Sequence, residues 1–163
     1  MLFNKMAFTE ADIYEIEAKM APLIGQKAWG VSLGFGSFIT LEFGQEIPPS
    51  KKDKKTHGEW HLWVYMCAWR LEKNNKFIVG SGADRSELEK VVQMMEGMSI
   101  DSIEILPVAG DTIIYFEEEL VLRIFSIYPS ERELWMLFAP DGNVLYIGPG
   151  TNWYYEPADL VKD

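Results

Sequence analysis

The segment from Trp60 to Leu71 places the strongest constraint on the fold, because its side chains alternate in character with the period of a β-strand. One set of alternate residues is wholly apolar: Trp60, Leu62, Val64, Met66 and Ala68. The opposite set, extended back to residue 57, mixes large aromatic side chains with titrating groups: His57, Glu59, His61, Trp63, Tyr65, Cys67 and Trp69. We predict one long strand that buries the first set, while the second set forms another packing layer or a binding surface.

Two helices and further short strands are predicted around this segment. Thr9 and Asp12 have the spacing of a capping box, which predicts a helix over residues 10–20. A second helix is expected to begin after Asp84 or Ser86 and to run to Met95. The other predicted strands cover residues 31–35, 38–43, 76–79, 100–106, 112–116, 120–128, 134–138 and 144–147. Residues 45–56, with two prolines and a lysine cluster, are expected to form a mobile surface loop.

The order of these elements recurs in residues 9–82 and 84–150, which indicates an internal duplication. Gly25 corresponds to Gly97 and Asn75 to Asn143, and the segments that follow the two asparagines share glycines and apolar positions. We therefore predict a single α+β domain over residues 1–163. In it, two pseudo-repeated helix-plus-antiparallel-strand units share one sheet, with both helices packed on one face of that sheet.

Composition and charge limit the compartment and the class of partner. The formal net charge is −10, which would repel a phosphate backbone, so nucleic-acid binding is not expected. Residues 51–55 contribute +3, and the remaining 24 acidic and 11 basic side chains sum to −13. The sequence contains no apolar run long enough for a membrane span, no signal-peptide pattern and one cysteine, so we expect a cytoplasmic protein without membrane association.

The two histidines of the chain suggest a metal site as one possibility. His57, Glu59 and His61 would project from one side of an extended strand, and zinc accepts imidazole and carboxylate ligands. An ordinary packed or exposed histidine pair is the alternative, since no fourth ligand stands out nearby. Cys67 lies on the same predicted face as His61, but six residues of extended chain would separate them by roughly 20 Å, so no catalytic pair is expected.

The expected function is therefore a non-catalytic intracellular binding or protein-interaction module with an acidic, aromatic-rich surface. Its partner would be another protein, in particular a basic one, or a small ligand, and no cofactor is expected. The candidate binding residues are His61, Trp63, Tyr65, Cys67, Trp69 and Tyr128. Two alternatives remain: a small metal-dependent hydrolase that uses His57, Glu59 and His61, and a homodimer closed by the aromatic face.

Overall fold

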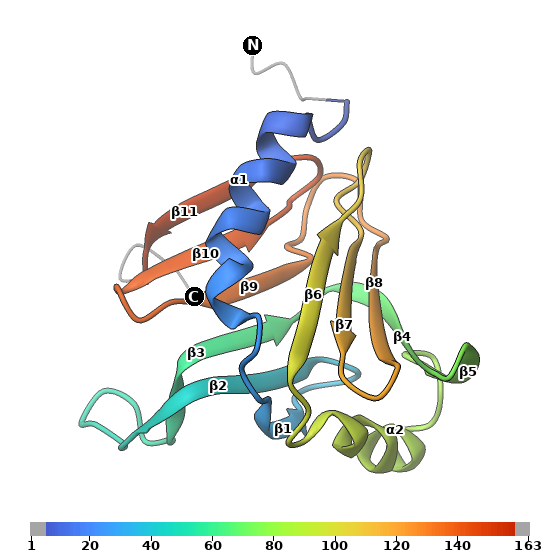
Figure 1. Ribbon diagram of the computed structural model, residues 1–163. Helices are drawn as coiled ribbons and strands as arrows, with labels where there is room; N and C mark the ends of the chain where they lie inside the picture. Colours follow the sequence, from blue (N-terminus) through green and yellow to red (C-terminus); the bar gives the residue numbers. More distant parts are fainter. Residues whose placement is uncertain (1–5, 159–163) are drawn as a thin grey trace.

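The computed structural model describes residues 6–158 and shows an α+β fold with two antiparallel sheets and two short helices (Figure 1). The six-stranded sheet has the strand order β1-β2-β3-β9-β10-β11, and the five-stranded sheet has the order β5-β4-β8-β7-β6. The α+β class and the antiparallel pairing are thus confirmed. The prediction of one shared sheet is wrong.

The element bounds follow the predicted pattern closely in most of the chain. The helices are α1 (Glu10–Met20) and α2 (Arg85–Val91), and 3₁₀ turns follow them at Ala21–Leu23 and Val92–Met95. The strands are β1 (Trp29–Leu33), β2 (Ile39–Ile47), β3 (His57–Val64), β4 (Cys67–Lys73), β5 (Lys76–Gly80), β6 (Ile100–Ile105), β7 (Thr112–Phe116), β8 (Leu120–Ser126), β9 (Trp135–Phe138), β10 (Asn143–Ile147) and β11 (Trp153–Pro157). Strand β11 was not predicted.

Two sheets form because the predicted long strand bends at Tyr65 and Met66. The N–H of Tyr65 donates to the carbonyl of Leu134 at 3.0 Å, and that of Met66 donates to the carbonyl of Glu133 at 3.3 Å. The chain then leaves β3 in one sheet and enters β4 in the other. The bend shifts the inward-facing set by one residue, so Cys67 and Trp69 point into the core instead of sharing a face with Trp63.

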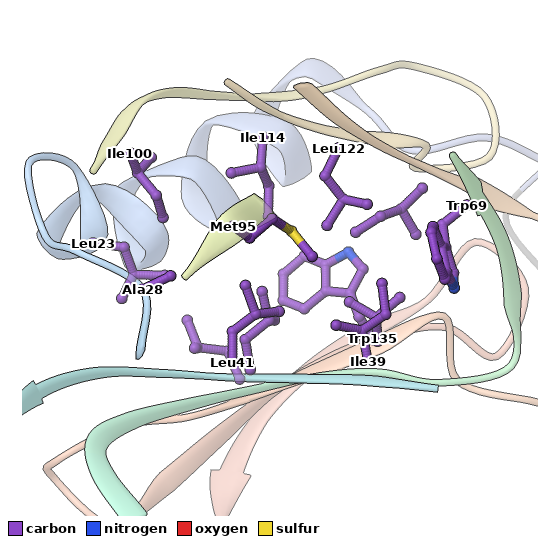
Figure 2. Packing of buried hydrophobic residues seen from close by; sticks show 14 of the residues in the cluster. Leu23, Ala28, Ile39, Leu41, Trp69, Met95, Ile100, Ile114, Leu122 and Trp135 are labelled. Atoms are coloured by element: carbon purple, nitrogen blue, oxygen red, sulfur yellow. The ribbon is translucent and has the colours of Figure 1, made fainter. Parts of the chain in front are cut away.

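The core lies between the two sheets. Figure 2 shows Ile39 and Leu41 from β2 facing Ile114 and Leu122 across Trp135. The indole N–H of Trp135 donates to the Thr112 hydroxyl at 2.9 Å, which links the inner faces of both sheets. Among the described residues, no buried side-chain nitrogen or oxygen lacks a hydrogen-bond partner. The few polar groups buried in the apolar interior are therefore all hydrogen-bonded.

Both helices pack against edge strands, and α2 contacts an edge strand of each sheet. Helix α1 begins with the predicted capping box, in which Thr9 and Asp12 exchange hydrogen bonds, and it contacts β6. Helix α2 contacts β1 and β5, and the Glu96 carboxylate beyond it accepts the N–H groups of Gly30 and Val31. This arrangement differs from the predicted packing of both helices on one face of a single sheet.

The two halves of the chain exchange strands between the sheets. Strands β1–β3 of the first half share a sheet with β9–β11, while β6–β8 of the second half share a sheet with β4 and β5. The connections β3–β4 and β8–β9 are the points where the chain crosses from one sheet to the other. This order of elements is the one that a duplication would give, and the duplication itself stays a prediction.

The surface loop is shorter than predicted. Residues 45–47 continue β2, because Glu46 and Ile47 pair with Gly58 and His57 at the start of β3. The loop therefore covers residues 48–56. Its mobility stays a prediction, as does the single-domain assignment, whose ends at residues 1–5 and 159–163 lie outside the described residues.

Candidate functional site

The candidate site lies on the outer face of the six-stranded sheet, the side turned away from the five-stranded sheet. Leu41, Leu62, Leu137 and Leu145 point into the core, so their neighbours along each strand point outward. Cross-strand pairing places the outward side chains in two rows. The rows are Thr40, Trp63, Met136, Tyr146 and Tyr154, and Glu42, His61, Phe138, Val144 and Glu156.

Four aromatic rings form a contiguous group at one end of β3, which we call the aromatic cluster: Phe35, Phe38, Trp63 and Tyr65. The Phe38 ring centroid lies 4.7 Å from that of Tyr65 and 6.3 Å from those of Trp63 and Phe35. The Trp63 and Tyr65 centroids are 4.8 Å apart. Phe35 is 86% exposed and the other three rings are partly exposed, so the cluster is open to solvent.

At the other end of β3, both histidines of the chain converge on one buried carboxylate, a group that we call the histidine cluster: Glu42, His57 and His61. His61 Nδ1 lies 2.6 Å from Glu42 Oε1, and His57 Nδ1 lies 3.7 Å from the same oxygen. The N–H of Gly58 donates to Glu42 Oε2 at 3.0 Å. Glu42 is only 6% exposed, so its charge depends on these three partners.

A local distortion brings His57 to this group. On a straight strand, four residues would separate His57 from His61 by about 13 Å. Their ring centroids are 5.3 Å apart because β2 carries one extra residue between Phe43 and Glu46, which bends the pair of strands. Gly58 permits the close crossing, since a Cβ atom there would lie 2.5 Å from the Phe43 carbonyl oxygen.

Hydrogen bonding keeps the carboxylates of this region ionised. Burial raises the pKa of Glu42, but the hydrogen bonds from His61 and from the Gly58 N–H outweigh it, and the net shift is downward. The Lys55 N–H donates to Asp53 and lowers the pKa of that carboxyl, and a hydrogen bond from His57 Nε2 lowers it further. His57 therefore has a carboxylate at each of its two ring nitrogens.

Two hollows of about 400 Å³ each flank the histidine cluster. One lies over β3 and β9 and is bordered by Ile47, Asp53, Phe138 and Pro140. The other lies over β1 and β2 and is bordered by Trp29, Ser32, Thr40 and Lys55. Both share His57, His61 and Trp63, so these three side chains form the ridge between the hollows.

The structure separates the six predicted binding residues into three places. His61, Trp63 and Tyr65 lie together on the outer face, as the alternation predicted. Cys67 and Trp69 are 7% and 2% exposed and belong to the core, which corrects the prediction that they share this face. Tyr128 borders a separate hollow of about 290 Å³ with Pro129 and Pro149.

The structure brings together only two of the three predicted metal ligands. His57 and His61 meet, but the third ligand atom within reach comes from Glu42 on β2, whereas Glu59 lies against Gly44. Glu42 belongs to the alternate set of its own strand that also contains Phe38 and Thr40, and that alternation was the one signal that could have indicated it. The partner strand and the bend could not be inferred from β3 alone.

Cys67 is unsuited to nucleophilic catalysis. Burial raises the pKa of its thiol to about 12, so the reactive thiolate is scarce at neutral pH. The thiol donates to the carbonyl of Tyr65 at 3.8 Å, not to a histidine.

Comparison of the chain with protein-family models, with curated proteins and with solved structures found no match in any of the three. No helix within residues 6–158 has the length and apolar character of a membrane span.

Proposed function

We propose that this protein is a non-catalytic binding module that recognises a basic protein segment on the outer face of its six-stranded sheet. The aromatic cluster is the observation that carries the proposal. Four rings in a connected group, from the end of β3 and from the turn before β2, present apolar surface and π faces to solvent. Aromatic side chains of this kind are the usual anchors of protein interfaces.

The outer face of the other sheet supports this choice by contrast. There the charged side chains satisfy one another, since the Glu72 carboxylate accepts from Arg70 Nε at 2.6 Å and from Arg123 Nε at 2.8 Å. A surface ion-paired in this way has little to gain from a partner, because its groups would exchange one set of hydrogen bonds for another.

The charge of the protein favours a basic partner. The net charge of −10 attracts cationic segments over several ångströms and accelerates their encounter. Arginine and lysine side chains also bind over aromatic faces within about 6 Å of a ring centroid. Beside the cluster, Tyr65 and Met66 bond to the backbone of the loop that carries Glu131 and Glu133, which would pair with further basic groups.

A titration with two defined peptides tests the proposal. One probe alternates arginine and glycine, and the control probe alternates glutamate and glycine. We expect the arginine peptide to shift the indole N–H signal of Trp63, but not that of Trp153, whose indole N–H donates to Asp12 at 3.0 Å. Trp63→Ala and Tyr65→Ala should each weaken binding at least tenfold, while Tyr115→Ala on the other sheet should leave it unchanged. Equal binding of the two peptides would contradict the proposal.

A small metal-dependent hydrolase is the second candidate, and the convergence of Glu42, His57 and His61 favours it. The zinc-loaded, untagged protein should then cleave simple ester or phosphoester substrates, and Glu42→Gln should abolish that cleavage. A homodimer closed by the aromatic cluster is the third possibility. Light scattering of the wild type and of Trp63→Ala separates it from a heterologous interface.

We also propose that residues 9–82 and 84–150 are related by duplication and that the protein works in the cytoplasm. The exchange of strands between the two sheets supports the duplication. The cytoplasmic location rests on the single cysteine of the chain. Fractionation of cells that express the chain with no added targeting sequence tests the location.

A further inference from the structure

We propose that Glu42, His57 and His61 form a binding site for a divalent transition-metal ion of the zinc class. This site does not depend on recognition of a basic partner, since it lies at the opposite end of β3 from Phe38 and Tyr65. Within residues 6–158, no other group of three histidine, cysteine or acidic side chains brings its ligand atoms this close together.

The donor set and its spacing suit such an ion. One ligand atom from each side chain lies within 4.8 Å of the other two. In a tetrahedral zinc site with bonds of about 2.0–2.1 Å, the ligand atoms are about 3.4 Å apart, so modest side-chain rotations would close the site. Two imidazole nitrogens and one carboxylate oxygen form the mixed set that zinc, nickel and copper bind in preference to magnesium or calcium.

The hydrogen bonds around His57 leave a place for a cation. The Asp53 carboxylate can only accept, so its contact with His57 Nε2 puts a proton on that nitrogen. In the neutral ring, Nδ1 then carries a lone pair directed toward Glu42 Oε1, 3.7 Å away. A cation between these two acceptors would contact both, and it would take the place of the Nδ1 proton that His61 donates to the same oxygen at 2.6 Å.

A single divalent ion suits the geometry of the three side chains. The two ring centroids are 5.3 Å apart, so one ion could contact both imidazoles and the carboxylate together. Lys55 and Glu59 also line the adjoining hollows. Their opposite charges cancel, so the net negative charge of this region comes from Glu42 and Asp53.

The groups that hold the ligands are those expected around a metal centre. Asp53 would orient His57 from its far nitrogen, as carboxylates do behind many metal-bound histidines. The Gly58 N–H holds Glu42 by Oε2 and leaves Oε1 directed at the two rings. The fourth position would face the hollow bordered by Phe138 and Pro140, where water or a ligand atom could complete the coordination.

Calorimetric titration of untagged, chelator-treated protein with zinc chloride tests the proposal. We expect one ion per chain, at least a hundredfold weaker binding in Glu42→Gln, His57→Gln and His61→Gln, and about 10- to 100-fold weaker binding in Asp53→Asn. Glu59→Gln is the matched control, because it removes a carboxylate from the same strand that lies outside the site, and it should bind as the wild type does.

A second measurement keeps the test decisive if a variant misfolds. The wild-type chain has two histidines, so its imidazole nitrogen spectrum contains only two ring systems. Zinc should shift the Nδ1 resonances of both rings and leave each Nε2 resonance in its protonated form. Absence of stoichiometric zinc, or shifts at one ring only, would overturn the site.

Discussion

Gly25 and Gly97 occupy equivalent positions about a local two-fold relationship in which each glycine bonds to the segment that follows the other. The Gly25 N–H donates to the carbonyl of Ile100, and the Gly97 N–H donates to that of Ala28, both at 2.7 Å. The reciprocal bonds run from Ile100 to Gln26 and from Ala28 to Met98, both at 3.0 Å. The spacing between the corresponding residues is constant along these four bonds, which supports the proposed duplication.

Replacement of either glycine by alanine should therefore have nearly the same effect. Gly25 has φ of +86° and Gly97 has φ of +78°, and an added Cβ would meet no atom within 4 Å at either place. The cost is then conformational alone, about 1–2 kcal/mol for each variant. Urea unfolding measures both, and unequal losses that differ by more than about 1 kcal/mol would speak against equivalent environments.

The bond between Trp135 and Thr112 gives a prediction about the core. Thr112→Val keeps the shape of the side chain but leaves the buried indole N–H without its acceptor, so stability should fall by about 1–3 kcal/mol. Thr112→Ser keeps the hydroxyl and should lose less stability, chiefly because a methyl group is missing. Thermal or urea unfolding of the two variants compares them, and a valine variant as stable as the wild type would contradict the role of this bond.

Gly58 should prove essential to the histidine cluster. Gly58→Ala would place a Cβ 2.5 Å from the carbonyl oxygen and 2.9 Å from the amide nitrogen of Phe43, so β2 and β3 must separate. We expect a loss of at least 2 kcal/mol and a change in the imidazole spectrum of His57. Gly82→Ala is the matched control, since an added Cβ there meets nothing within 4 Å and φ is unexceptional.

Acidification should destabilise the protein partly through Glu42. Because the pKa of this carboxyl is lower in the folded chain than its ordinary value of 4.5, the unfolded chain binds its proton first as the pH falls. The stabilisation is complete above about pH 4.5 and is lost as the pH drops through the folded pKa. In Glu42→Gln the acid slope below pH 4.5 should be shallower. Unfolding free energies between pH 3 and pH 7, with Glu59→Gln as control, measure the difference.

The Cys67 thiol should be unreactive in the native protein. A pKa of about 12 and an exposure of 7% leave little accessible thiolate at pH 8. A chromogenic disulfide reagent should therefore label Cys67 at the rate at which the chain opens, and should label it at once in denaturant. Rapid labelling of the folded chain would mean that this thiol reaches solvent.

Local patterns allowed much of the fold to be predicted. Thr9 and Asp12 fix the start of α1 through neighbouring backbone groups, and the Asn74-Asn75 turn has the positive φ angles of a tight hairpin. The bend at Tyr65 and Met66 could not be predicted, since it depends on Glu133 and Leu134, nearly 70 residues away. Without that bend, Cys67 and Trp69 were placed on the wrong face.

The histidine cluster also depends on contacts between residues that lie far apart in the sequence. The alternation along β3 correctly put His61 and Trp63 on one face, because it depends only on strand geometry. Glu42 became a neighbour of His61 through the pairing of β2 with β3, and His57 joined through an extra residue in β2. Such non-local pairing is specified by the assembled sheet and leaves little trace in either strand alone.

The crossing of the chain between its sheets makes the two halves interlock. Residues 9–82 supply three strands to one sheet and two to the other, and the strands from α2 onward complete both. Neither half can close a sheet by itself, so each would expose unpaired strand edges if it folded first. Unfolding should accordingly be a single cooperative event, and a cut in the turn between β5 and α2 should give two fragments that fold only when mixed.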